Sequence, residues 1–292
     1  MDFPVKAGFY YYLYPGNHIR DFFMLSHNQL KHVSALKLKK FRDEYGEFAA
    51  EGNTLVQDLI QSPLEITSVY ALQSWIVDNL RMISEKKLNV YETEAQDMSR
   101  ISSLSSPSQV LAVVKIPDGA LKVLKAEDIE HPEEMFPGIF QMLSLVLEDI
   151  SDPGNFGTIV RIADWFGIQT IFCSESSVEL YNPKVIQSSM GSVARVRVVK
   201  ADLHSLLDKI RGRIPVYGTF LEGDNIYDKT LGTEGFIVIG SEAHGISAGL
   251  SSGITDRLFI PSFGSSGTGK AESLNAAVAT AIVISEFRRR TS

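Results

Sequence analysis

The sequence predicts a two-domain α/β protein whose C-terminal half forms a mostly parallel sheet with helices on both faces. Short apolar runs alternate regularly with helical patterns, and strong turn chemistry separates the first run from the first helix. The predicted strands cover residues 142–147, 170–173, 195–199, 216–221, 236–240 and 257–260. The predicted helices cover residues 155–166, 183–190, 203–211 and 273–288.

The N-terminal half predicts a second, smaller α/β unit. It combines a helical segment at residues 52–60 with β-like runs at 66–71 and 110–114. Residues 115–137 carry several prolines and acids, which favours a connection between domains that has room for a strand of its own. We expect an N-terminal extension at residues 1–30, a small domain at 31–116, a linker at 117–138 and the larger domain at 139–292.

Composition and charge limit the class of protein. The chain has 292 residues, of which 44% are hydrophobic and 22% charged, as in soluble globular proteins with a sizeable core. Its net charge of -7 argues against a protein that coats nucleic acid without specificity. One local basic patch is compatible with phosphate contact and equally with a solvated helix face. It consists of Lys31, Lys37, Lys39, Lys40 and Arg42.

Cysteine usage and hydropathy favour a cytoplasmic protein. The single cysteine, Cys173, lies in an apolar run, so we expect a small core residue and no disulfide framework. We find no basic and apolar signal segment at the start of the sequence. The longest apolar stretch near the C-terminus, residues 274–284, is too short to span a bilayer, so no membrane partner is expected.

The segment from Asp152 to Gly167 carries the clearest functional signal. Turn residues follow a buried strand there, and apolar residues at helical spacing continue up to Phe166. Because strand, turn and helix occur in that order, Asn155 and Arg161 are expected near the carboxyl edge of the sheet, where open α/β folds bind ligands. No Gly-x-Gly-x-x-Gly follows the first strand, so a dinucleotide-dependent oxidoreductase is disfavoured.

A glycine-rich segment near the C-terminus imitates a phosphate-binding P-loop. Gly264-Ser-Ser-Gly-Thr-Gly-Lys270 matches the start of that motif, but Ala271 stands where a hydroxyl must meet magnesium. The segment also follows the last predicted strand instead of the first. A nucleotide hydrolase is therefore disfavoured, and a flexible loop that a ligand could order is preferred.

Three segments of the C-terminal half match one family when taken together. They are Asp152-Pro-Gly-Asn-Phe-Gly157 with Arg161, Ile237-Val-Ile-Gly-Ser-Glu242 with Gly245, and Ile260-Pro261 with Ser273-Leu-Asn-Ala-Ala-Val-Ala279. In this order they resemble the SpoU (TrmH-type) ribose 2′-O-methyltransferases of the SPOUT superfamily of RNA methyltransferases. The loop between the two parts of the third match is longer than is usual in that family.

The N-terminal half is similar to the accessory substrate-binding domain of the same family. The similarity lies in Lys39-Lys-Phe-Arg42 and Phe48-Ala-Ala-Glu-Gly52. That accessory domain resembles ribosomal RNA-binding proteins, so residues 31–116 are expected to recognise RNA. The tyrosine-rich first residues match nothing in the family.

The resemblance implies an S-adenosylmethionine-dependent RNA methyltransferase that modifies a ribose 2′-hydroxyl, with 23S-type ribosomal RNA as the expected substrate. It also implies a catalytic C-terminal domain tied in a deep trefoil knot, and a homodimer whose interface lies near the site. Transfer RNA is the alternative substrate. The alternative class is a non-catalytic RNA-binding protein that kept the fold.

The resemblance also implies roles for individual residues. It assigns catalysis and substrate contact to Arg161, Asn155, Glu242, Ser273 and Asn275. It assigns cofactor binding to the main chain around Thr219, Gly240, Ile260 and Leu274. RNA contact is expected at Lys39, Lys40 and Arg42.

Most of these residues have a purely structural alternative. Arg161 is expected to clamp phosphate and stabilise charge, since a guanidinium resists acting as a base, but it could instead pair with Asp164. Asn155 and Asn275 could simply cap their helices, and Glu242 could be a surface turn carboxylate.

The histidines do not indicate a metal site. His204 and His244 lack a cluster of cysteines or carboxylates at metal-ligand spacing, so no metal is expected. His244 lies in the cofactor-side loop at residues 241–245, where a minor binding role stays open.

Overall fold

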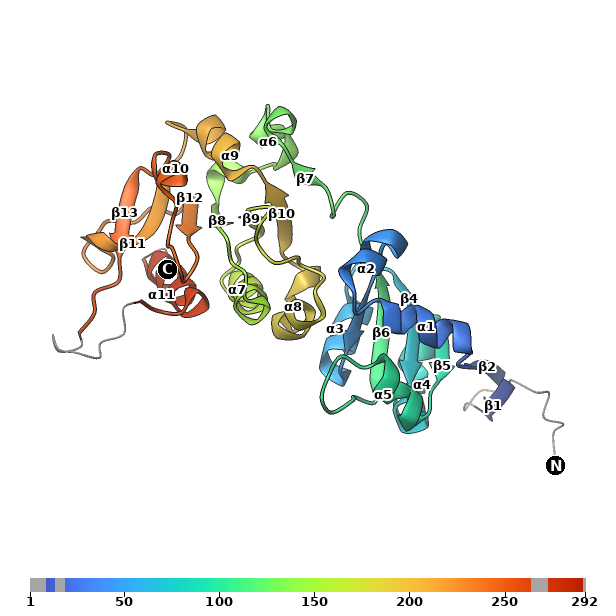
Figure 1. Ribbon diagram of the computed structural model, residues 1–292. Helices are drawn as coiled ribbons and strands as arrows, with labels where there is room; N and C mark the ends of the chain where they lie inside the picture. The colour runs from blue at the N-terminus through green and yellow to red at the C-terminus, as the bar shows by residue number, and fades with distance from the viewer. Residues whose placement is uncertain (1–8, 14–18, 264–272, 291–292) are drawn as a thin grey trace. The chain divides into compact units, whose positions relative to one another are not determined.

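The computed structural model describes residues 9–13, 19–263 and 273–290, and it divides the chain into two compact units (Figure 1). The first unit ends at Asp118 and includes residues Tyr181–Pro183, and the second takes Gly119–Leu180 and the chain from Lys184 onward. The P-loop-like segment and Ala271 lie outside the described residues. No helix in the described part of the chain is long and apolar enough to cross a membrane.

The first unit contains a mixed sheet with the order β1-β2-β5-β4-β6-β3. Its strands are β1 (Phe9–Leu13), β2 (Ile19–Met24), β3 (Glu47–Glu51), β4 (Ile66–Ala71), β5 (Val90–Glu92) and β6 (Val110–Lys115). Its helices are α1 (His27–Ala35), α2 (Lys39–Tyr45), α3 (Asn53–Gln61), α4 (Gln73–Glu85) and α5 (Ala95–Ile101). The predicted helix at residues 52–60 and the predicted strands at 66–71 and 110–114 are confirmed as α3, β4 and β6, within one residue at each end.

The second unit contains a seven-stranded sheet with the order β13-β11-β12-β8-β9-β10-β7. Its strands are β7 (Val123–Leu124), β8 (Leu143–Leu147), β9 (Thr170–Cys173), β10 (Arg197–Ala201), β11 (Val216–Asn225), β12 (Gly235–Ile239) and β13 (Asp256–Phe259). Its helices are α6 (Pro132–Met135), α7 (Pro153–Trp165), α8 (Pro183–Ser189), α9 (Leu203–Ile210), α10 (Ala248–Ser251) and α11 (Ala276–Arg289). All of its strand pairs are parallel, which confirms the predicted parallel sheet.

Helices cover both faces of this sheet, as predicted. Residues of α7 and α11 pack into one core, and residues of α9 and α10 pack into the core on the opposite face (Figure 1). Cys173 is fully buried in the first of these cores, and its burial raises its pKa to about 12. The cysteine is therefore a small core residue, as expected from its apolar neighbours.

The segment predicted as a linker carries a strand of its own. Within residues 117–138, β7 pairs in parallel with β10 at the edge of the second sheet, and α6 follows it. Four elements of the second unit differ from their predicted bounds by two residues or more: α7, β10, β11 and α11. Strand β11 runs on to Asn225 because it continues beside β13 after a bulge, and α11 begins at Ala276 instead of residue 273.

The order of the strands defines a point where the chain changes direction across the sheet. From β8 the chain moves outward through β9 to β10, whereas β12, β11 and β13 lie on the other side of β8. Strands β8 and β12 are neighbours, in register from Leu143 with Gly235 to Leu147 with Ile239. Ligands of open α/β sheets bind at the carboxyl ends of strands at such a point.

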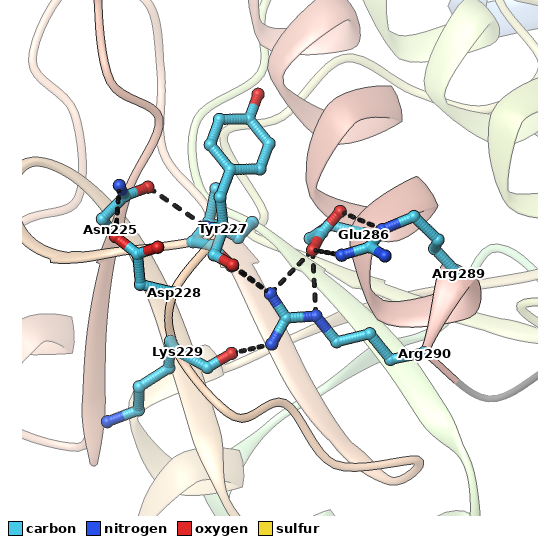
Figure 2. A network of polar contacts seen from close by, with 8 residues as sticks. Asn225, Tyr227, Asp228, Lys229, Glu286, Arg289 and Arg290 are labelled. Carbon is cyan, nitrogen blue, oxygen red and sulfur yellow. Dashed lines mark hydrogen bonds and ion pairs between the residues drawn. The ribbon is translucent and has the colours of Figure 1, made fainter.

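A polar network near the C-terminus fastens the last helix to a loop of the same unit, as Figure 2 shows. The Arg290 guanidinium donates hydrogen bonds to the carbonyl oxygens of Ile226 at 3.1 Å, Tyr227 at 2.7 Å and Lys229. It also donates from Nε to the carboxylate of Glu286 at 2.9 Å. One side chain therefore satisfies three backbone acceptors and one buried carboxylate.

Replacing Arg290 with alanine should lower the free energy of unfolding at pH 7 by about 2 kcal/mol, because three backbone carbonyls lose their donor and Glu286 loses one of its two arginine partners. Hydrogen bonding from Arg289, together with Arg290, lowers the pKa of Glu286 to about 2 from 4.5. The stabilisation is present above pH 4.5, and the difference in free energy of unfolding between wild type and Arg290→Ala should shrink as the pH falls toward 2.

Urea unfolding at several pH values measures this difference, with Arg211→Ala as control. Arg211 forms only an exposed pair with Asp208, so an equal loss in both variants would contradict the prediction.

Candidate functional site

Helix α7 begins at the carboxyl end of β8, where the chain changes direction across the sheet. The Asp152 carboxylate accepts a hydrogen bond from the backbone N–H of Asn155 at 2.8 Å, and Pro153 occupies the first helical turn. That hydrogen bond is the main reason why the pKa of Asp152 is lowered. Asp152 is therefore the N-cap, and the alternative that Asn155 caps this helix is wrong. The Asn155 side chain instead extends to other loops.

Asn155 connects three loops that are far apart in sequence. Its Nδ2 donates to Oε1 of Glu242 at 2.5 Å, and its Oδ1 accepts from Nδ2 of Asn275 at 2.9 Å. Asn275 also caps α11, since its Oδ1 accepts from the backbone N–H groups of Ala277 and Val278 at 3.0 and 3.2 Å. For Asn275, capping and site contact therefore coexist.

The groups at the two ends of this array determine which side-chain atoms donate and which accept. The backbone N–H groups of α11 can only donate, so Asn275 must present its oxygen to them and its nitrogen to Asn155. An ionised Glu242 can only accept, so Asn155 must present its nitrogen there. Both amide orientations are thus determined by chemistry, and the three side chains form one rigid polar array at the carboxyl edge.

Arg161 lies two turns into α7 and is exposed. It makes no hydrogen bond or ion pair with any residue that the structure describes. The alternative pairing with Asp164 is wrong, because the Asp164 carboxylate accepts from Arg195 at 2.8 Å and from the Ser192 hydroxyl at 2.7 Å. The Arg161 guanidinium is therefore available to an anionic ligand.

Gly240 lies directly after β12 and has no room for a side chain. A Cβ there would lie 2.2 Å from the carbonyl carbon of Gly245 and 2.4 Å from the nitrogen of Ile246. The segment folds back on itself, because the N–H of Gly245 donates to the carbonyl of Ser241 at 2.9 Å. The segment thus presents main chain with a glycine at each end of a tight turn, which suits an adenosine or amino-acid ligand that needs main-chain partners with little side-chain obstruction.

The other predicted cofactor residues lie at the same edge of the sheet or at the start of α11. Thr219, Gly240 and Ile260 belong to or follow β11, β12 and β13, which are neighbouring parallel strands. The Thr219 hydroxyl is engaged, since it donates to the carbonyl of Val238 at 3.1 Å. Leu274 is exposed, as is Ser273, which makes no capping contact with α11.

The three residues predicted to contact RNA differ in the structure. Lys39 is exposed and pairs with Asp43, and Lys40 is exposed with its ammonium 5.7 Å from the centre of the Phe41 ring. Arg42 is only 2% exposed and donates from Nη1 to the carbonyl of Leu36 at 2.7 Å, and burial lowers its pKa. The prediction for Arg42 is therefore wrong, because a buried guanidinium held by the main chain does not reach a phosphate.

The histidines take structural or loop positions. The His204 ring packs against Gly249, where an added Cβ would lie 2.4 Å from Nε2. His244 is exposed, and its backbone N–H donates to the Ser241 hydroxyl at 3.2 Å. Among the described residues there is no group of three or more His, Cys, Asp or Glu side chains that could hold a metal ion.

The sequence analysis missed one acidic residue at this edge, Glu148. Its carboxylate accepts a hydrogen bond from the backbone N–H of Ser247 at 2.8 Å. The available signal was its position, since Glu148 directly follows a buried strand much as Glu242 follows the neighbouring one. Only the adjacency of β8 and β12 shows that the two carboxylates serve the same loop.

Comparison with known proteins agrees with this geometry. Residues 142–285 match the SpoU rRNA Methylase family, and residues 27–112 match the MRM3-like substrate binding domain. The chain is 27% identical to the 23S rRNA (guanosine(2553)-2′-O)-methyltransferase RlmP of Bacillus subtilis, over 89% of this chain and 96% of that protein.

Solved structures give the same assignment. One is a candidate RNA methyltransferase of the TrmH family from Porphyromonas gingivalis, with 36% identity, a TM-score of 0.74 and coverage of 91% of this chain and 99% of that one. Another is an AdoMet-bound rRNA methyltransferase from Sinorhizobium meliloti, with 25% identity, a TM-score of 0.74 and coverage of 92% and 97%. The similarity thus extends over both units.

Proposed function

The chain belongs to the SpoU (TrmH-type) family of RNA methyltransferases, and we propose that it transfers a methyl group from S-adenosylmethionine (AdoMet) to a ribose 2′-hydroxyl of ribosomal RNA. One observation carries the proposal. Asn155, Glu242 and Asn275 form a continuous polar array where the chain changes direction across the sheet, and the exposed Arg161 lies six residues after Asn155 on α7. Named relatives that act on 23S rRNA support the substrate class.

The residues of this site divide the work by their chemistry. AdoMet, when bound, supplies an electrophilic methyl group. The main chain around Gly240 and Ile260 offers donors and acceptors for it in a segment without obstructing side chains. Glu242 can accept a hydrogen bond from the ribose hydroxyl, and Asn155 keeps that carboxylate in place. Arg161 can clamp a neighbouring phosphate with both arms of its guanidinium.

We propose that positioning provides most of the rate enhancement. Orienting a poor nucleophile against a methyl donor can supply about 7 to 11 kcal/mol of barrier reduction. The array is suited to this, because each amide orientation is determined by its neighbours and α11 anchors one end. Arg161 then acts as a charged clamp and not as a base, since a guanidinium stays protonated at neutral pH.

We propose that the first unit binds RNA through its exposed lysines. Lys39 and Lys40 are on the surface of α2, and the match of residues 27–112 to a substrate binding domain supports this role. The net charge of -7 limits nonspecific binding, so recognition of a defined RNA fold is expected. Transfer RNA is the second candidate substrate, and the experiment below separates the two.

The function is tested by transfer of labelled methyl from AdoMet to ribosomal RNA and to transfer RNA, both from cells that lack this protein. The expected result is incorporation into ribosomal RNA that makes the modified linkage resistant to alkali, because a 2′-O-methyl group blocks cleavage there. Incorporation into transfer RNA alone would show that the substrate is transfer RNA and not ribosomal RNA. AdoMet binding without transfer to RNA or to ribosomal particles would instead indicate a non-catalytic RNA-binding protein.

We also propose a homodimer that uses the exposed apolar surface of α7 and α11. Trp165 on α7 is 85% exposed and Val278 on α11 is 49% exposed, and the two helices pack into the same core. A groove of about 410 Å³ adjoins this surface. It is lined by Phe166, Tyr227, Ala281, Ile282, Ser285 and Glu286.

Replacing Trp165 with glutamate should weaken this dimer at least about 30-fold, because the charge would be buried without a partner. Sedimentation equilibrium of both proteins measures the dissociation constant. Val77→Glu is the control, since Val77 is an exposed apolar residue on α4, outside the proposed interface. A wild-type monomer at micromolar concentration, or equal weakening in both variants, would contradict the proposal.

We further propose the deep trefoil knot that the family resemblance implies for the second unit. The match of residues 142–285 to the SpoU rRNA Methylase family supports it. An experimental tracing of the main chain through residues 216–290 tests the topology, and an unthreaded path would reject it.

A further inference from the structure

We propose that Glu148 is a positioning residue of the methyl-transfer site and acts by holding the segment 240–247. This inference rests on the proposed function. Glu148 directly follows β8 and is partly buried. Its Oε2 accepts a hydrogen bond from the backbone N–H of Ser247 at 2.8 Å, across 99 residues of sequence.

Glu148 fastens both ends of this segment. Its backbone N–H donates to the carbonyl of Ile239 at 2.9 Å, immediately before the segment starts. Its carboxylate holds Ser247, the residue that caps α10 through a hydrogen bond from the N–H of Leu250 to its hydroxyl at 3.2 Å. Ile239, which precedes the segment, and Ser247, its last residue, are therefore both held by the one residue that follows β8.

The segment between these ends has little freedom to absorb a shift. Gly240 packs directly against the main chain of Gly245, and Gly245 is bonded back to Ser241. Displacement at Ser247 therefore moves the backbone that is proposed to bind AdoMet. It also moves Glu242, whose carboxylate meets Asn155 at 2.5 Å.

Hydrogen-bond chemistry distinguishes positioning from direct ligand contact. A glutamine at position 148 still offers an oxygen acceptor to the Ser247 N–H, but it removes the negative charge. A residue that only positions the segment should tolerate this exchange. A carboxylate that contacted the cofactor or the RNA through its charge should not.

The experiment compares Glu148→Ala and Glu148→Gln with Glu175→Ala as matched control. Glu175 lies two residues after the neighbouring strand β9, at the same edge of the sheet. Its side chain is exposed and pairs with Lys125. The measurements are AdoMet affinity by calorimetry, kcat and KM for methyl transfer, and hydrogen exchange of residues 241–250.

Glu148→Ala should bind AdoMet about tenfold more weakly and exchange faster at residues 241–250, with kcat at saturating AdoMet within about threefold of wild type. Glu148→Gln should recover most of the affinity, and Glu175→Ala should match wild type. Unchanged affinity and exchange in Glu148→Ala would overturn the inference, as would a glutamine variant as impaired as the alanine one.

Failure of the proposed function would appear separately, as a wild-type protein without AdoMet binding or methyl transfer. The exchange measurement would still decide whether Glu148 holds the segment.

Discussion

Arg161→Ala is expected to lower the rate of methyl transfer by about 100- to 1,000-fold, the usual cost of removing one preorganised charged group from a transition state. The side chain is exposed and has no partner among the described residues, so its loss should leave the fold intact. Single-turnover transfer to ribosomal RNA measures the effect, and calorimetry should show unchanged AdoMet affinity.

Two further variants sharpen this test of Arg161. Arg161→Lys keeps the charge but not the planar fork, so it should recover only part of the rate if bidentate contact matters. Arg211→Ala removes an exposed arginine that lies directly after α9. This variant should transfer methyl at the wild-type rate. Full activity of Arg161→Ala would exclude this residue from the site.

Gly240→Ala is expected to weaken AdoMet binding by about 100-fold or more, the second large effect. The new methyl group would meet backbone atoms of Gly245 and Ile246 at 2.2 to 2.4 Å, and backbone cannot move aside as a side chain can. The whole turn would have to open, which would also displace Glu242. Calorimetry with AdoMet checks this, together with thermal unfolding to establish that the variant is folded.

Gly232→Ala is the matched control for this substitution. Its added Cβ would meet the Tyr217 hydroxyl at 3.3 Å and the main chain of Glu234 no closer than 3.5 Å, so a small adjustment suffices. AdoMet affinity should therefore stay at the wild-type value. Equal weakening in the two variants would mean that the turn at Gly240 has no special part in cofactor binding.

The C-terminal unit was largely predictable because its strands are buried on both faces. Such strands appear in the sequence as short apolar runs, and β9 matches its predicted bounds at both ends. Strand β11 was predicted too short because its last residues are mostly exposed and resume pairing with β13 only after a bulge. Helix α4 was not predicted, although it buries Trp75, Ile76 and Ile83 at helical spacing.

The structure confirms the strands and helices that carry the predicted site residues, and it corrects some of the contacts expected for them. Asp152 and Asn155 are both residue types that cap helices, and residue type alone could not decide which of them caps α7. The charge pattern could not separate Arg42, which is buried, from Lys39 and Lys40, which are exposed, because all three belong to one basic run. Burial depends on which face of α2 meets the rest of the unit.

The sequence by itself determined the fold class and the residue types at the carboxyl edge of the sheet, because periodicity and turn chemistry are local properties of the chain. The family followed from the resemblance of three short motifs, which are also local. Only the tertiary structure decided which of these residues meet. Asn155 is 87 residues from Glu242 and 120 from Asn275, and they come together because β12 lies beside β8 and α11 packs on α7. Strand order and helix packing follow from burial of the whole core, so contacts of this range, including that of Glu148 with Ser247, are not encoded in any local segment.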